Sequence, residues 1–261
     1  MFFTRDRDFY KTLVRLAIPI ALQNAVTFAV NFADNLMVGT LGDSAISGVY
    51  VGNQLQTVLQ MFVAGIEGAI LILAAQYWGK RDTGSIRKIV SIGVRFAVLV
   101  GVLITLVAFL FPSQIMRIFT SDASVIEMGT PYVRVVSLSY LFFCISQVLI
   151  ASMRAVETAK IGLFVSCVAL IVNVSLNYVL IFGKLGFPAL GVTGAAIATL
   201  ISRIVESTVM VVYVRLIDRK LCLRFKDLLK NDRRLTRDFL RYGTPIVGGQ
   251  IVWSVNMMGQ T

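Results

Sequence analysis

The chain has 261 residues, 57% of them hydrophobic, and a formal net charge of +11. Soluble domains contain about 45–50% apolar residues even with glycine counted, so this composition indicates a membrane protein. The basic residues lie between apolar blocks, where they set membrane topology. No motif interleaves aromatic and basic residues, so we expect no nucleic-acid partner.

Several kinds of catalyst are excluded by what the sequence lacks. It has no histidine, which rules out His-based triads and His-ligated zinc sites. The three cysteines are isolated, and there is neither a GxSxG motif nor a Walker loop. We therefore predict that the protein is not an enzyme, that it holds no metal or other cofactor, and that an ion gradient or a partner drives any transport.

Seven apolar blocks define the predicted organisation. They cover about residues 13–40, 46–76, 89–111, 130–152, 160–182, 191–216 and 242–261. A spanning helix needs roughly 20 mostly apolar residues. The blocks therefore predict an all-α polytopic membrane protein with six transmembrane helices over 1–214, a basic cytoplasmic linker over 215–241 and a truncated seventh helix over 242–261.

The orientation follows from the distribution of Lys and Arg. With a cytoplasmic N-terminus, the inner segments carry twenty basic residues and the outer loops carry two, Arg117 and Lys184. Cytoplasmic loops are enriched in Lys and Arg. We predict a multi-pass protein of the cell (inner, cytoplasmic) membrane with its N-terminus in the cytoplasm and the loops near Asp43, Asp122 and Lys184 outside.

The first block has a polar stripe. Pro19, Gln23, Thr27, Asn31 and Asp34 follow one another at steps of four, four, four and three, which places them on one helix face. An acid within a membrane span is costly and usually faces a protein cavity. The stripe therefore predicts a cavity wall that includes Asp34. The alternative is that Asp34 is merely solvated near the far interface.

The second block has a similar stripe, made of Asn53, Gln56, Gln60 and Glu67. Their spacing puts all four on one helix face, where we expect them to line the same cavity. Glu67 lies well inside its block and is a candidate proton- or cation-binding acid. The alternative is that Glu67 lies near the cytoplasmic mouth and pairs with Arg95 or Lys80.

The fifth and sixth blocks carry further polar groups. Asn173 and Asn177 are four residues apart and could ligate a hard cation or form hydrogen bonds between helices. In the sixth block, Arg203 and Glu206 are one turn apart, and we predict a structural ion pair. The small residues there predict a close-packing face that Thr199 extends: Gly191, Gly194, Ala195, Ala196 and Ala198.

The seventh block repeats part of the first. Arg15, Pro19, Ile20 and Val26 recur after 226 residues as Arg241, Pro245, Ile246 and Val252. Parallel repeats of this kind build some transporters, with the substrate path between the two halves. We expect a partial chain, or a half that must pair with a second lobe or a second chain.

Several motifs, in order, resemble the multidrug and toxic compound extrusion (MATE) family. The first block has Pro19 followed by FADNLMVGTLG, and the second ends in AAQYWGKRD. The fifth and sixth read NVSLNYVLIFG and LGVTGAAIAT, and TPIVGGQ opens the seventh. The match covers nearly the whole chain, but only the first half of a family architecture of about twelve helices.

The resemblance implies the N-terminal half of an antiporter that exports organic cations or amphipathic drugs against inward Na⁺ or H⁺. It implies that Asp34 is the coupling acid and that Asn173 and Thr199 match residues that some members place around it. Asn177 stands where those members have Asp, which removes one negative charge from the site. The resemblance assigns no role to Glu67.

Two other functions stay open. One is an exporter or flippase of lipid-linked or polysaccharide precursors from the same superfamily, although bases within the spans are few. The other is a membrane subunit that does not transport and packs against a partner. In every case the lipid bilayer is the surrounding medium.

Overall fold

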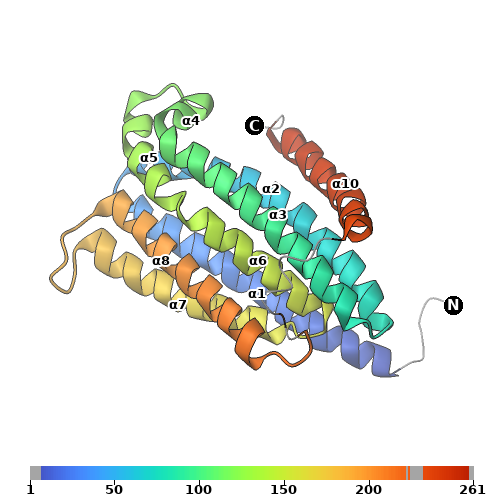
Figure 1. Ribbon diagram of the computed structural model, residues 1–261. Helices are drawn as coiled ribbons and strands as arrows, with labels where there is room; N and C mark the ends of the chain where they lie inside the picture. The colour runs from blue at the N-terminus through green and yellow to red at the C-terminus, as the bar shows by residue number, and fades with distance from the viewer. Residues whose placement is uncertain (1–6, 222, 224–231, 259–261) are drawn as a thin grey trace.

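Figure 1 shows the computed structural model, which describes residues 7–221, 223 and 232–258. The regular elements are α1 (Arg7–Gly39), α2 (Asp43–Gly79), α3 (Thr83–Leu110), α4 (Pro112–Phe119), α5 (Ala123–Val136), α6 (Ser139–Ala155), α7 (Lys160–Phe182), α8 (Gly191–Val212), the π-helical turn η1 (Tyr213–Ile217) and α10 (Arg233–Met258). The all-α prediction is confirmed for these ranges.

Five helices in the described ranges are long and apolar enough to cross a membrane: α1, α2, α3, α7 and α8. The bent pair α5 and α6 makes a sixth candidate if it counts as one span. These elements correspond to the first six predicted blocks. The protein is therefore a multi-pass membrane protein.

The fourth block is not the single straight helix predicted over 130–152, because α5 and α6 meet at a 52° bend. At the junction the Ser137 hydroxyl donates to the Arg134 carbonyl (2.9 Å), and the Ser139 hydroxyl donates to the Val136 carbonyl (2.6 Å). These carbonyls would accept from backbone N–H groups in a continuous helix. Side-chain competition of this kind bends helices.

The seventh helix begins at Arg233, earlier than the predicted residue 242. Asp232 accepts from the Leu235 backbone N–H (3.3 Å) and forms an ion pair with Lys88 of α3 (3.1 Å). Phe239 is buried and stacks on Phe96 of α3, with ring centroids 5.8 Å apart. The first turns of α10 are amphipathic and anchored to α3, so a search for apolar runs alone missed them.

The helix α2 lies at the centre of the bundle and packs against α3, α5, α6 and α10. The helices α7 and α8 form a second group, and α1 packs chiefly on α7 (Figure 1). The outer surface of α1 is apolar and exposed, with large side chains that include Leu13, Ile18, Phe28, Phe32 and Leu36.

The two ends of the bundle differ in composition. At one end, the start of α2 meets the start of α5, where the Ser44 and Ser124 hydroxyls are 3.4 Å apart. The other end is basic: the Lys220 ammonium donates to the Val156 carbonyl (2.6 Å) and lies over the Trp78 ring, 5.4 Å from its centroid. Segments far apart in sequence therefore form the two ends.

At each end of the bundle, an aspartate caps the N-terminus of one helix. The Asp82 carboxylate accepts from the backbone N–H of Ser85 at the start of α3 (3.0 Å), and Asp122 accepts from that of Ser124 at the start of α5 (2.8 Å). Hydrogen bonds from the Ser85 and Ser124 side chains contribute most to lowering the pKa of these carboxyls below the usual aspartate value.

The small-residue face predicted for the sixth block allows α8 to approach α7 closely. A Cβ atom at Gly194 would lie 2.6 Å from the backbone oxygen of Leu180. Backbone atoms cannot move aside as a flexible side chain can. Gly194 therefore fixes the spacing between the helices that carry Thr199 and Asn177.

We expect Gly194→Ala to lower the stability of the folded protein by about 1–3 kcal/mol, because the added methyl group forces the two helices apart. Unfolding in detergent micelles measures this change. The control is Gly248→Ala in α10, where a Cβ atom would have no neighbour within 4 Å. Equal stability of the two variants would contradict the close-packing role of Gly194.

Candidate functional site

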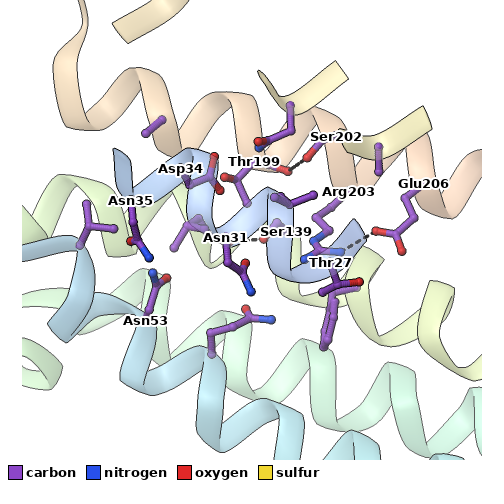
Figure 2. Close-up of a pocket in the computed structure, with 18 of the residues that line it drawn as sticks. Thr27, Asn31, Asp34, Asn35, Asn53, Ser139, Thr199, Ser202, Arg203 and Glu206 are labelled. Atoms are coloured by element: carbon purple, nitrogen blue, oxygen red, sulfur yellow. Dashed lines mark hydrogen bonds and ion pairs between the residues drawn. The ribbon is translucent and has the colours of Figure 1, made fainter. Parts of the chain in front are cut away.

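A cavity of about 240 Å³ opens between α1, α2, α5, α6, α7 and α8 (Figure 2). Most of its lining residues are polar. The polar lining residues are Thr27, Asn31, Asp34, Asn35, Asn53, Gln56, Thr57, Gln60, Tyr132, Ser139, Gln147, Ser166, Asn173, Thr199, Ser202, Arg203 and Glu206. Amides and hydroxyls make up most of this set, and such groups can solvate a polar or charged guest inside a membrane.

Asp34 is the acid on the α1 wall of the cavity. The side-chain amide of Asn177 on α7 donates a hydrogen bond to Asp34 Oδ1 and another to Asn173 Oδ1 (3.2 Å). Asp34 is half-buried, whereas both asparagines are buried. The carboxylate is therefore bound to α7 through the Asn177 side chain.

The asparagine pair leaves hydrogen-bonding capacity unused. Asn177 Oδ1 and Asn173 Nδ2 are buried and have no partner in the described part of the chain. An unpaired buried carbonyl oxygen is an unfavourable arrangement that a cation or a proton donor would relieve. With Asp34 and the Thr199 hydroxyl, Asn177 Oδ1 offers the oxygen chemistry that a hard cation prefers.

The structure brings most of the predicted cavity residues together. Thr27 and Asn31 of α1, and Asn53, Gln56 and Gln60 of α2, line the same space as Asp34. Asn173 and Thr199 line it from α7 and α8. Asn177 is not among the lining residues, but it contacts the cavity through Asp34 and Asn173.

Three predicted cavity residues lie outside the lining set: Pro19, Gln23 and Glu67. Gln23 is buried, and its Oε1 accepts from the Arg154 guanidinium of α6 (2.9 Å). Glu67 is half-buried on α2, and the charge of Arg154 acts on it electrostatically. The stripes continue past the cavity because a straight helix carries one face along its whole length.

The cavity also contains residues that the sequence analysis placed elsewhere or missed. The predicted ion pair of Arg203 and Glu206 is confirmed, with Nη1 and Oε2 2.6 Å apart, but both residues line the cavity. The Arg203 guanidinium lies 5.0 Å from the centroid of the Phe143 ring. Tyr132 was missed because a lone tyrosine gives no sequence signal; its hydroxyl donates to Asn53 Oδ1 (3.0 Å).

Comparison with known families agrees with this geometry. A family model described as MatE matches residues 19–179, which include Asp34, both asparagines and most of the cavity wall. The chain belongs to the MATE family. The resemblance predicted from the motifs is therefore confirmed.

Curated relatives include proteins named for multidrug resistance. A probable multidrug resistance protein NorM from Rhizobium meliloti (strain 1021) is 30% identical over 206 residues, which cover 79% of this chain and 44% of that protein. The probable multidrug resistance protein YoeA from Bacillus subtilis (strain 168) is 28% identical over 95% of this chain and 54% of its own length. The chain thus spans about half the length of these relatives.

Solved structures share the fold. A transporter of the MOP superfamily from Pyrococcus furiosus superposes with a TM-score of 0.85 at 24% identity, over 95% of this chain and 54% of that one. A MATE structure described as the straight conformation gives 0.84 at 25% identity, with the same coverage. The chain therefore has the fold of about half of a MATE transporter, as expected for an N-terminal lobe.

The hydrogen bond from Tyr132 to Asn53 joins α5 to α2 inside the cavity wall. We expect Tyr132→Phe to lower the stability of the MATE lobe by about 0.5–1.5 kcal/mol, because Asn53 Oδ1 loses a buried partner. Unfolding in detergent micelles measures the loss. Tyr178→Phe is the matched control, since Tyr178 is 53% exposed on the outer surface; an equal effect there would contradict the assignment.

Proposed function

We propose that this chain forms the N-terminal lobe of a cation-coupled antiporter that exports organic cations or amphipathic drugs. The observation that carries the proposal is a carboxylate, Asp34, held by Asn177 at the wall of a cavity lined by amides. An ionised carboxylate in a membrane interior is costly when no cation accompanies it. Asp34 would therefore bind one positive charge at a time.

Because Asp34 binds one positive charge at a time, a coupling ion and a substrate cation exchange at this site. A proton or Na⁺ on Asp34 neutralises the carboxylate, and an organic cation neutralises it equally well, so the two compete for one site. For Na⁺, the proposed ligands are oxygen atoms of Asp34, Asn173, Asn177 and Thr199. The unpaired Asn177 Oδ1 supports this set, although the second carboxylate of some family members is absent.

Neutralisation of Asp34 would also loosen helix α1. The hydrogen bond from Asn177 holds this region of α1 against α7, and a neutral carboxyl group accepts a weaker hydrogen bond than a carboxylate. Pro19 lies inside α1 and removes one backbone hydrogen bond, so the helix can bend there. We propose that ion binding at Asp34 and bending at Pro19 are coupled in this way.

The polar face of α1 needs a facing partner. Thr27, Asn31 and Asn35 line the cavity but remain exposed in the lobe by itself. Lipid cannot satisfy such groups, and each one left unsatisfied costs several kcal/mol. We propose that a second helical lobe, in the same polypeptide or in another chain, covers this face.

The other functions have less support. An exporter of anionic lipid-linked precursors would need free positive charge in the cavity, but Arg203 is paired with Glu206. A subunit that does not transport would tolerate neutralisation of Asp34. The experiment on Asp34 therefore also separates transport from a purely structural role.

We expect Asp34→Asn to weaken ethidium binding to the purified protein by about tenfold or more, because the cation loses its counter-charge. In the unmodified protein, raising the Na⁺ or proton concentration should also weaken ethidium binding. This competition should vanish in Asp34→Asn. Fluorescence titration in detergent measures both effects.

The matched control for this experiment is Asp43→Asn, because Asp43 is exposed at the start of α2, outside the cavity. This control should bind ethidium with normal affinity and keep the competition. Unchanged binding and competition in Asp34→Asn would refute the coupling role of Asp34.

We also propose that the basic end of the lobe lies in the cytoplasm, as the distribution of Lys and Arg indicates. In a background without Cys144, Cys167 and Cys222, Lys184→Cys should react with a membrane-impermeant thiol reagent in intact cells. Lys80→Cys, at the other end of the bundle, should react only after the cells are opened. The reverse pattern would overturn the orientation.

A further inference from the structure

The cavity holds three charged side chains among its described lining residues: Asp34, Arg203 and Glu206. Figure 2 shows them around the same space, with Asp34 contributed by α1 and the other two by α8. Two are acids and one is a base. The cavity therefore carries one more negative than positive charge when all three are ionised.

Arg203 is held firmly in this arrangement. Its Nη1 donates to Glu206 Oε2 at 2.6 Å, and its guanidinium lies over the Phe143 ring. The Glu206 side chain is 2% exposed and that of Arg203 is 20% exposed. Arg203 therefore compensates the charge of a deeply buried acid, and the charge of Asp34 is left for a guest.

We infer that the Arg203–Glu206 pair sets the number of positive charges that the cavity accepts, and that its guest is a monovalent organic cation. The inference rests on the proposed function, in which Asp34 is the cation-binding carboxylate. Uncompensated charge is costly in a cavity enclosed within a helix bundle, so the cavity favours a guest that brings its total charge to zero. One positive charge meets this condition, whereas the second charge of a dication would meet the positive charge of Arg203.

Substitutions in the pair change the charge balance in a defined way. Arg203→Gln leaves two negative charges, so the cavity should now favour a dication whose second charge meets Glu206. The double substitution Arg203→Gln with Glu206→Gln restores one negative charge. The double variant also avoids leaving Glu206 buried without a counter-ion, so it remains informative if Arg203→Gln fails to fold.

The test uses ethidium, which carries one positive charge, and propidium, which has the same ring system with a second cationic group. Fluorescence titration of the purified protein gives the ratio of their dissociation constants. The unmodified protein should prefer ethidium. Arg203→Gln should shift the ratio toward propidium by about tenfold or more, and the double variant should shift it back toward ethidium.

Arg117→Gln is the matched control, because Arg117 is exposed on α4 outside the cavity; the ratio should not change there. An unchanged ratio in Arg203→Gln, or the same ratio in the single and double variants, would overturn the inference but leave the proposed function standing. If Arg203→Gln does not fold, the double variant decides: loss of its preference for ethidium overturns the inference. If the unmodified protein binds neither dye, the proposed function fails, and the inference fails with it.

Discussion

The hydrogen bond from Asn177 to Asp34 is the interaction on which the site depends. Helix α1 exposes a long apolar face and packs chiefly on α7. The bond joins these two helices at Asp34, the half-buried acid of the α1 cavity wall. A carboxylate without this donor would have to be hydrated, and the cavity wall would lose its organisation.

Charged residues are concentrated in two regions of the MATE lobe, the basic end of the bundle and the cavity. The basic residues gather at one end of the bundle, where Lys220 and Lys88 contact neighbouring segments. Inside the bundle, the charged residues of the cavity are few, and Arg203 is compensated by Glu206. The same physical cost, that of desolvating a charge, accounts for both distributions.

Much of the fold was predictable, because the length and apolarity of a membrane span are local properties of the sequence. The departures arose where particular hydrogen bonds and an aromatic contact, rather than runs of apolar residues, decide where a helix bends or begins. The hydroxyls of Ser137 and Ser139 divide the fourth span into α5 and α6. Asp232 and Phe239 start α10 within a segment that is too polar to count as an apolar block.

The sequence by itself determined which helix faces are polar, and so placed Thr27, Asn31, Asp34, Asn53, Gln56 and Gln60 on the surfaces that form the cavity. Only the tertiary structure decided where each stripe stops being cavity wall. Gln23 and Glu67 share these faces but lie outside the cavity, where Gln23 binds Arg154 of α6, and the Arg203–Glu206 pair faces inward. The reason is physical: spacing along one helix fixes the direction of a side chain, whereas its partner depends on how neighbouring helices rotate and cross.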